Sequence, residues 1–114
     1  MGTRESSAPD LLPGTLEMII LETLGANGAM HGFGIARHLK TRSREVIQVG
    51  EGSLYPALQR LLVNGLVKAE WKMSEQNRRA RYYSITAAGK KRLAADIAEF
   101  DQMVDAIRRI LRPA

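Results

Sequence analysis

The stretch EGSLYPALQRL, residues 51–61, decides the fold of this chain. Its leucines at positions 54, 58 and 61 recur at i, i+4 and i+7, which is the spacing of a helix that buries one face. Because a proline is tolerated near the first turn of a helix, Pro56 places the predicted start at about Gly52–Ser53. Asn64-Gly65 is typical of a helix end. The sequence therefore predicts an amphipathic helix over residues 51–64.

The other faces of this helix carry the candidate DNA contacts Ser53, Tyr55, Pro56, Gln59 and Arg60. The N-terminal half of a recognition helix reaches base edges in the major groove, and its free N–H groups favour phosphate. Ser53 and Gln59 can hydrogen-bond to bases or phosphate, and Arg60 can hold a phosphate. Tyr55 offers a hydroxyl group and a flat ring. The alternative for Tyr55 is packing against a following hairpin.

Two helices are predicted before this segment. Pro13 suits the first position of a helix, and an apolar face follows it up to a stop at residues 25–28. A second helix is predicted over residues 32–40. The side chains expected to face inward from it are Phe33, Ile35, Ala36 and Leu39.

A change of period follows the central helix. Residues 66–73 alternate apolar and charged side chains, residues 74–80 form a polar turn, and residues 81–85 form a return strand. Thr86 is placed to cap a last helix over residues 87–111. Three helices followed by a hairpin is the winged helix-turn-helix order. The predicted fold class is mainly α with a small β-hairpin: a winged helix-turn-helix plus a long C-terminal dimerisation helix.

The predicted domain organisation has three parts. Residues 1–10 are small and polar and are expected to form a flexible N-terminal arm. Residues 11–86 form the winged-helix DNA-binding domain, and residues 87–114 form the dimerisation helix. A chain of 114 residues buries only a modest core, so association with a second copy is a common supplement to its stability.

The middle of the chain is strongly basic. Between Arg37 and Arg92 there are thirteen Lys or Arg residues against four Glu, whereas the two ends are acidic. In the predicted hairpin, Arg78, Arg79 and Arg81 cluster at the tip and on the return strand, where a wing would contact DNA backbone or minor groove. This charge distribution predicts double-stranded DNA as the partner. The alternative is a hairpin tip whose charges are merely solvated.

The last helix carries one apolar stripe that nothing later in the chain covers. Its members are Leu93, Ile97, Phe100, Val104, Ile107 and Leu111. An exposed stripe of this size predicts a second copy of the chain as its cover, with help from Leu16 and Ile20 of the first helix. The alternative is that the helix folds back on its own domain.

Several function classes are disfavoured by the sequence. The chain has no cysteine, and its two histidines, His31 and His38, have no third ligand at metal spacing, so no metal site and no cofactor are expected. No convergent catalytic set is visible, so the chain is not expected to be an enzyme. No stretch is long and apolar enough to cross a bilayer, which predicts no membrane partner and a soluble, cytoplasmic protein.

Four motifs together resemble the PadR family of bacterial transcriptional regulators. They are residues 14–17 (GTLE), 31–35 (HGFGI), 52–58 (GSLYPAL) and 81–89 (RYYSITAAG). The short C-terminal region is similar to the compact subgroup, which has a single dimerisation helix. Gly34 departs from the pattern, because relatives tend to have Glu or another good helix former there. That departure predicts a short or locally loose second helix.

The resemblance implies a homodimeric repressor that binds a palindromic promoter site and is released by a small aromatic effector. Tyr55 and its neighbours would contact DNA, and residues 93–111 would form the dimer. A possible effector pocket at the dimer centre would use Trp71, Phe100 and Met103. The alternative for Trp71 is packing under the wing. The alternative function is a winged-helix module that binds another protein and no specific DNA sequence.

Overall fold

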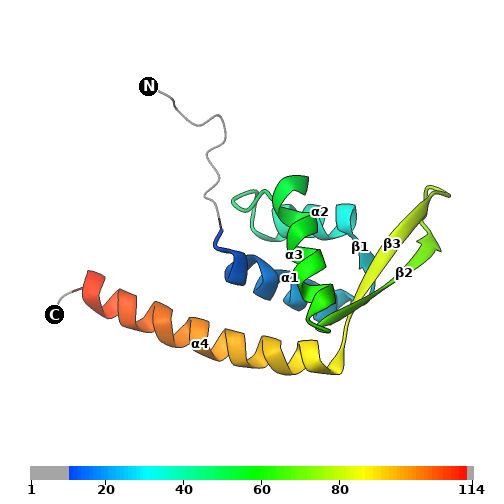
Figure 1. Ribbon diagram of the computed structural model, residues 1–114. Coiled ribbons are helices and arrows are strands. Elements are labelled where there is room, and N and C mark those ends of the chain that lie inside the picture. The colour runs from blue at the N-terminus through cyan, green and yellow to red at the C-terminus, as the bar shows by residue number, and fades with distance from the viewer. Residues whose placement is uncertain (1–10, 113–114) are drawn as a thin grey trace.

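The computed structural model describes residues 11–112, so the predicted arm at residues 1–10 lies outside the described residues. Figure 1 shows the four helices and three strands of these residues. The elements are α1 (Pro13–Asn27), β1 (Met30–His31), α2 (Gly32–Arg42), α3 (Glu51–Val63), β2 (Val67–Met73), β3 (Arg79–Ile85) and α4 (Ala87–Leu111). The predicted fold class is confirmed, and the boundaries of α4 agree with the prediction.

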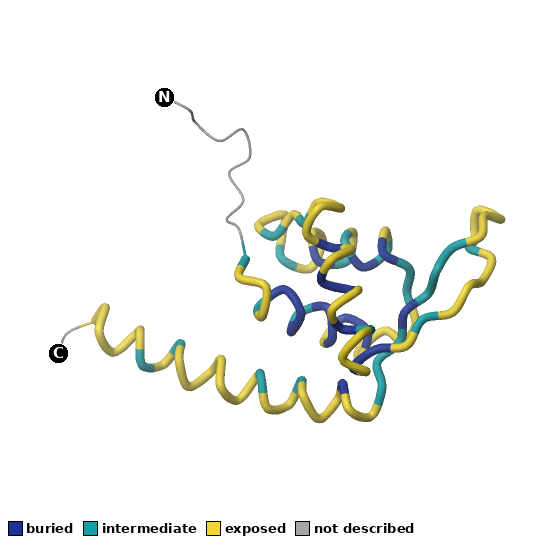
Figure 2. Tube along the Cα trace, viewed as in Figure 1, coloured by how far each residue is buried: buried dark blue, intermediate teal, exposed yellow. Residues whose placement is uncertain are grey.

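The core lies where α1, α2 and α3 meet the base of the sheet. Ile20, Leu21, Ile35, Leu58 and Leu61 are all fully buried there. These side chains come from the apolar faces of three helices, so their burial fixes each helix in its rotation. Figure 2 shows the buried segments gathered in this helical layer, while most of α4 and the far half of the hairpin are exposed.

The sheet has one strand more than the sequence predicts. Its order is β1-β3-β2, and the short strand β1 pairs with β3 through Met30 with Tyr83 and His31 with Tyr82. A strand of two residues carries no periodic pattern, so sequence reasoning could not detect it. Its effect is to tie the start of α2 to the return strand of the hairpin.

The inward orientation predicted for Phe33 is wrong. Its side chain is 69% exposed, whereas Ile35 and Leu39 of the same helix are buried. The predicted looseness around Gly34 is not seen either, because α2 is continuous from Gly32 to Arg42. The Gly34 N–H donates to Nδ1 of His31 at 3.0 Å, so His31 caps the helix and Gly34 occupies its first turn.

Helix α3 begins at Glu51, which places Pro56 just past the first turn. Without an N–H, Pro56 leaves the Gly52 carbonyl oxygen free of its helical partner. The helix ends as predicted, because Gly65 has φ 72° and the N–H of Leu66 donates to the Leu61 carbonyl oxygen at 2.9 Å. The turn then leads directly into β2.

The wing consists of β2, the turn at residues 74–78, and β3. Asn77 has φ 61°, a conformation that Asn adopts readily, and its N–H donates to the Ser74 carbonyl oxygen at 2.9 Å. The register pairs Trp71 with Arg81 and Met73 with Arg79. Because directly opposed residues of an antiparallel pair project to the same side, these four side chains share one face of the wing.

Helix α4 begins at a double anchor made by Thr86. The Gly89 N–H donates to Thr86 Oγ1 at 3.0 Å, and the Thr86 hydroxyl donates to the Gly65 carbonyl oxygen at 2.7 Å. The predicted cap is therefore confirmed. From this anchor α4 runs past α1 and out along the molecule (Figure 1).

Candidate nucleic-acid interface

The centre of the exposed face of α3 carries few bulky side chains. Leu54, Ala57, Leu58 and Leu61 are buried, so the centre of the opposite face is formed by the exposed residues Gly52, Pro56, Gln59 and Val63. Of these, Gln59 alone carries hydrogen-bonding groups on its side chain. A helix with so little bulk on its outer face can approach another surface closely, and Gln59 stands at its centre. The predicted exposure of Ser53, Pro56 and Gln59 agrees with the structure.

Tyr55 lies at the edge of this face, toward the wing. Its ring packs so closely over Gly32 at the start of α2 that a Cβ on Gly32 would lie 2.6 Å from the Tyr55 hydroxyl oxygen. Burial, followed by the nearby Glu51 carboxylate and Tyr83, raises the pKa of Tyr55 above its ordinary value. The hydroxyl therefore keeps its proton at neutral pH and can donate a hydrogen bond. About half of the side chain stays exposed to make one.

The wing turns the face that carries Arg79 and Arg81 toward α3. The guanidinium of Arg79 lies 4.9 Å from the centre of the Trp71 ring, and that of Arg81 lies 6.0 Å from the centre of the Tyr83 ring. Both arginines belong to the face that the register gives to Trp71 and Met73. On the other face, Lys72 lies over Tyr82 at 5.5 Å. The two faces of the wing are thus both cationic, but only one of them looks onto α3.

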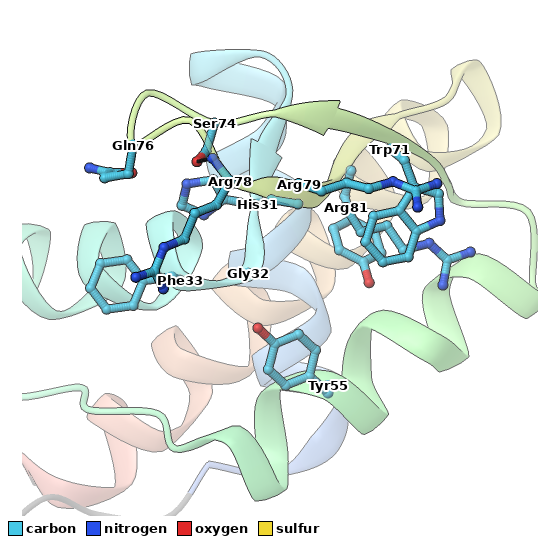
Figure 3. A pocket seen from close by; sticks show the side chains of 12 residues that line it. His31, Gly32, Phe33, Tyr55, Trp71, Ser74, Gln76, Arg78, Arg79 and Arg81 are labelled. Carbon is cyan, nitrogen blue, oxygen red and sulfur yellow. Dashed lines mark hydrogen bonds between the residues drawn. The ribbon is translucent and has the colours of Figure 1, made fainter.

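Together α3 and the wing border a groove of about 750 Å³, which Figure 3 shows from close by. Tyr55 rises into it from α3, and Arg79 and Arg81 reach in from β3. The remaining residues that line it are His31, Gly32, Phe33, Trp71, Ser74, Gln76, Arg78, Ala80 and Tyr83. We call it the interface groove. It combines three guanidinium groups, the Tyr55 hydroxyl and exposed aromatic rings, which suits a polyanion that also offers flat sugar and base surfaces.

The sequence missed several members of this groove. His31, Gly32, Ser74 and Gln76 come from the start of α2 and the tip of the wing. His31 and Gly32 belong to the motif at residues 31–35, but nothing in the motif places it beside α3. The signal that was available for Ser74 and Gln76 is their position in the polar turn of the hairpin.

Arg60 makes a contact within the protomer that the sequence did not predict. Its Nε–H donates to Glu17 Oε2 of α1 at 2.6 Å, and the Glu17 side chain is only 10% exposed. The pair joins α1 to α3 across the edge of the core and holds Arg60 toward α1, while 43% of the Arg60 side chain stays exposed. The sequence did not predict this pair, because its two residues lie 43 positions apart in the chain.

This ion pair predicts a measurable contribution to stability. Arg60→Ala leaves the Glu17 carboxylate nearly buried with no partner, which costs about 1–3 kcal/mol of the free energy of unfolding. Urea denaturation followed by circular dichroism measures it. Arg92→Ala is the matched control, because Arg92 pairs with Asp96 at the surface of α4 and such pairs contribute about 0.5 kcal/mol or less. Equal losses from both variants would contradict the assignment.

Most of the predicted dimer stripe is exposed on α4, whereas the residues assigned to it on α1 are buried. Phe100 and Ile107 are 45% and 46% exposed, and Ile97 and Leu111 lie exposed on the same side of the helix. The contribution predicted from Leu16 and Ile20 is wrong: they are 4% and 0% exposed because they fill the core of their own protomer. Leu93 also packs partly against that core. Val104 is half-buried.

The predicted effector pocket does not form within the protomer. Trp71 lines the interface groove, whereas Phe100 and Met103 line a separate cavity of about 370 Å³ between the start of α1 and α4. The alternative that Trp71 packs under the wing is wrong as well, since its side chain is 56% exposed.

The described part of the chain has neither a metal-binding cluster nor a membrane-spanning helix. Residues 11–112 contain no group of three His, Cys, Asp or Glu side chains that could hold a metal ion. His31, one of the two histidines, is used as a helix cap. Within the same residues, no helix combines the length and the apolar character that crossing a bilayer requires.

The sequence profile of the PadR-like family of transcriptional regulators matches residues 20–95, which is more than half of the chain. The chain belongs to the PadR-like family. The matched region runs from the buried middle of α1 through α3 and the wing to the start of α4. The resemblance inferred from the four motifs is therefore confirmed, and the interface groove lies inside the part that defines the family.

Solved structures agree with this membership. A transcriptional regulator from Clostridium thermocellum superposes on this PadR-like protein with a TM-score of 0.79 at 28% identity, over 87% of this chain and 95% of its own. A PadR-like transcription factor from Bacteroides fragilis gives 0.70 at 30% identity, over 86% and 91%. A PadR family regulator from Eggerthella lenta gives 0.75 at 26% identity, over 89% and 85%. The winged-helix fold and the role of transcriptional regulator follow from these matches.

Proposed function

We propose that this PadR-like protein is a homodimeric repressor that binds a palindromic promoter site. In each half-site α3 lies in the major groove with Gln59 toward the base edges, and the wing lies over the adjacent backbone. The observation that carries the proposal is the interface groove, in which three arginines of the wing lie together with Tyr55 of α3. Ser53 and Pro56 belong to the same contact surface.

Two copies of the groove are needed to read a palindrome, and α4 supplies the means to join them. Its stripe around Ile97, Phe100 and Ile107 is exposed in the protomer, and a second copy of the same stripe is a matching cover. A two-fold axis that relates the two α4 stripes also relates the two α3 helices, which gives them the symmetry of an inverted repeat.

Release by a small aromatic effector is the second half of the proposal. The cavity between α1 and α4 adjoins the dimer stripe and is lined by Leu12, Met18, Phe100 and Met103 among others. Its apolar and methionine side chains, bordered by Arg92, Asp96 and Glu99, suit a flat ligand that also carries a polar group. Since α1 also packs on α3, a ligand that moves α1 would disturb the DNA-binding helix.

The proposal is tested by titrating the protein into a fluorescent duplex of the region upstream of its own gene. We expect saturable binding that weakens steeply as salt rises, and that outlasts a large excess of unrelated DNA. Binding that unrelated DNA abolishes at equal concentration would instead support the protein-interaction alternative.

The roles of helix and wing predict different responses to substitution. Arg79→Ala removes a phosphate contact and is expected to weaken binding to all sequences alike and to lower the salt slope by about 1. Gln59→Ala is expected to relax the preference at one or two base pairs, worth about 1–3 kcal/mol of discrimination. Affinity measured on a panel of single-base variants separates the two.

The matched control is Lys72→Ala, which removes a wing charge from the face turned away from α3. It should leave the salt slope nearly unchanged. If Lys72→Ala reduced the salt dependence of binding as much as Arg79→Ala does, charges on both faces of the wing would contribute equally to DNA binding. That result would contradict the assignment of the DNA contact to the face with Arg79.

A further inference from the structure

Trp71 is the one tryptophan of the chain, and the fold does not use it as core. It stands on β2 in the outer part of the wing with 56% of its side chain exposed. Burying a large aromatic ring would contribute to stability, so a ring left in solvent suggests a role outside the core. The cavity between α1 and α4 does not include it.

The neighbours of Trp71 are cations. Arg81 stands directly across from it on β3, and the Arg79 guanidinium lies 4.9 Å from its ring centre. Figure 3 shows the Arg79 side chain extended along β3 to the Trp71 ring, above Tyr55. A guanidinium that stacks on a ring uses its flat face, so the N–H groups at its edge stay free to donate.

We propose that Trp71 is a positioning residue, which holds the Arg79 guanidinium toward the interface groove so that it meets a DNA phosphate already oriented. A free arginine side chain has many rotamers to lose when it binds a phosphate, and stacking removes part of that loss beforehand. The inference rests on the proposed function, because it concerns the same DNA contact. It assigns Trp71 a role in DNA binding that acts through Arg79.

The test is a double-mutant cycle on the duplex of the upstream region, with Trp71→Ala, Arg79→Ala and both together. Trp71→Ala is expected to weaken binding about fivefold and to lower the salt slope toward that of Arg79→Ala. The doubly substituted protein should bind no more weakly than Arg79→Ala alone, because Trp71 then has nothing to position. Losses that multiply in the double variant would mean that Trp71 contacts DNA itself, and would overturn the inference.

Two matched variants distinguish the loss of the aromatic ring from the loss of side-chain volume. Trp71→Phe keeps a ring for stacking and should recover most of the affinity. Met73→Ala removes an exposed apolar side chain directly across from Arg79 and should change affinity less than twofold. An equal loss from Met73→Ala and Trp71→Ala would contradict a role for the ring.

A measurement without DNA checks the contact independently. Because Trp71 is the single tryptophan, the protein's tryptophan fluorescence reports on the contact between its ring and Arg79. Arg79→Ala should change that fluorescence, and Lys72→Ala should leave it unaltered. An unchanged emission would overturn the inference. Failure of the unsubstituted protein to bind any duplex would overturn the proposed function and this inference with it, whereas binding with multiplying losses would overturn the inference alone.

Discussion

Gly89→Ala is expected to destabilise the fold more than alanine at any other glycine of residues 11–112. Gly89 is buried in the first turn of α4, and a Cβ there would overlap the Leu66 carbonyl oxygen and lie 2.7 Å from Ile85 Cγ1. The Leu66 carbonyl accepts the Thr86 N–H at 3.1 Å, so it cannot turn away without breaking the anchor of α4. We expect a loss of about 3 kcal/mol or more, against a total stability of roughly 5–15 kcal/mol for such domains.

Thermal denaturation followed by circular dichroism measures this loss. A loss of that size lowers the melting temperature by more than about 10 °C in a domain of this length. The control is Gly52→Ala, because nothing lies within 4 Å of the position of its Cβ and alanine is the better helix former. A Gly89→Ala protein that melts with the unsubstituted chain would show that α4 begins differently from its arrangement here.

Phe100→Asp and Ile107→Asp are expected to have the largest effects on function. Each places a carboxylate in the middle of the stripe that a second copy would cover. Because both copies of a two-fold dimer carry the substitution, two carboxylates would be buried at the interface. We expect a monomer in sedimentation at micromolar concentration. Binding to a two-half-site duplex should then fall by about a hundredfold or more, because the half-sites are no longer engaged together.

The control for the dimer is Gln102→Asp, which adds the same charge to the nearly opposite, exposed side of α4. It should sediment and bind DNA as the unsubstituted protein does. Because Phe100 also lines the cavity between α1 and α4, Ile107→Asp is the cleaner of the two variants. A dimer that survives Ile107→Asp would contradict the role of the stripe.

The helices were predictable from sequence because each has an apolar face with helical spacing, and several of their ends carry a local signal. Thr86 and the stripe of α4 placed that helix at the residues where it stands, and Gly65 placed the end of α3. The hairpin was predicted from its change of period, although β3 begins at Arg79, two residues earlier than Arg81. The polar side chains of the turn concealed those first two residues of the strand.

The errors share a physical cause, which is that contacts distant in sequence leave no local trace. The pair of Arg60 with Glu17 was missed because the two residues lie on different helices. Phe33 was placed in the core because the spacing of a helix admits more than one inner face.

The candidate interface was predicted in its parts but not in its geometry. Gln59 and Tyr55 were expected on the exposed side of the third helix, and Arg79 on the wing. The close fit of the Tyr55 ring over Gly32, and the stacking of Arg79 on Trp71, depend on how β1 and the wing pack beside α3. No pattern within a single element carries that information.

The most direct test of the central claim is selection of bound duplexes from a random pool by the purified protein, followed by sequencing. A homodimer that reads DNA with α3 should enrich an inverted repeat whose half-site centres lie about one helical turn apart, or a multiple of it. Enrichment of a single unrepeated sequence would contradict the dimeric reading of a palindrome. A pool that stays random would contradict sequence-specific DNA binding altogether.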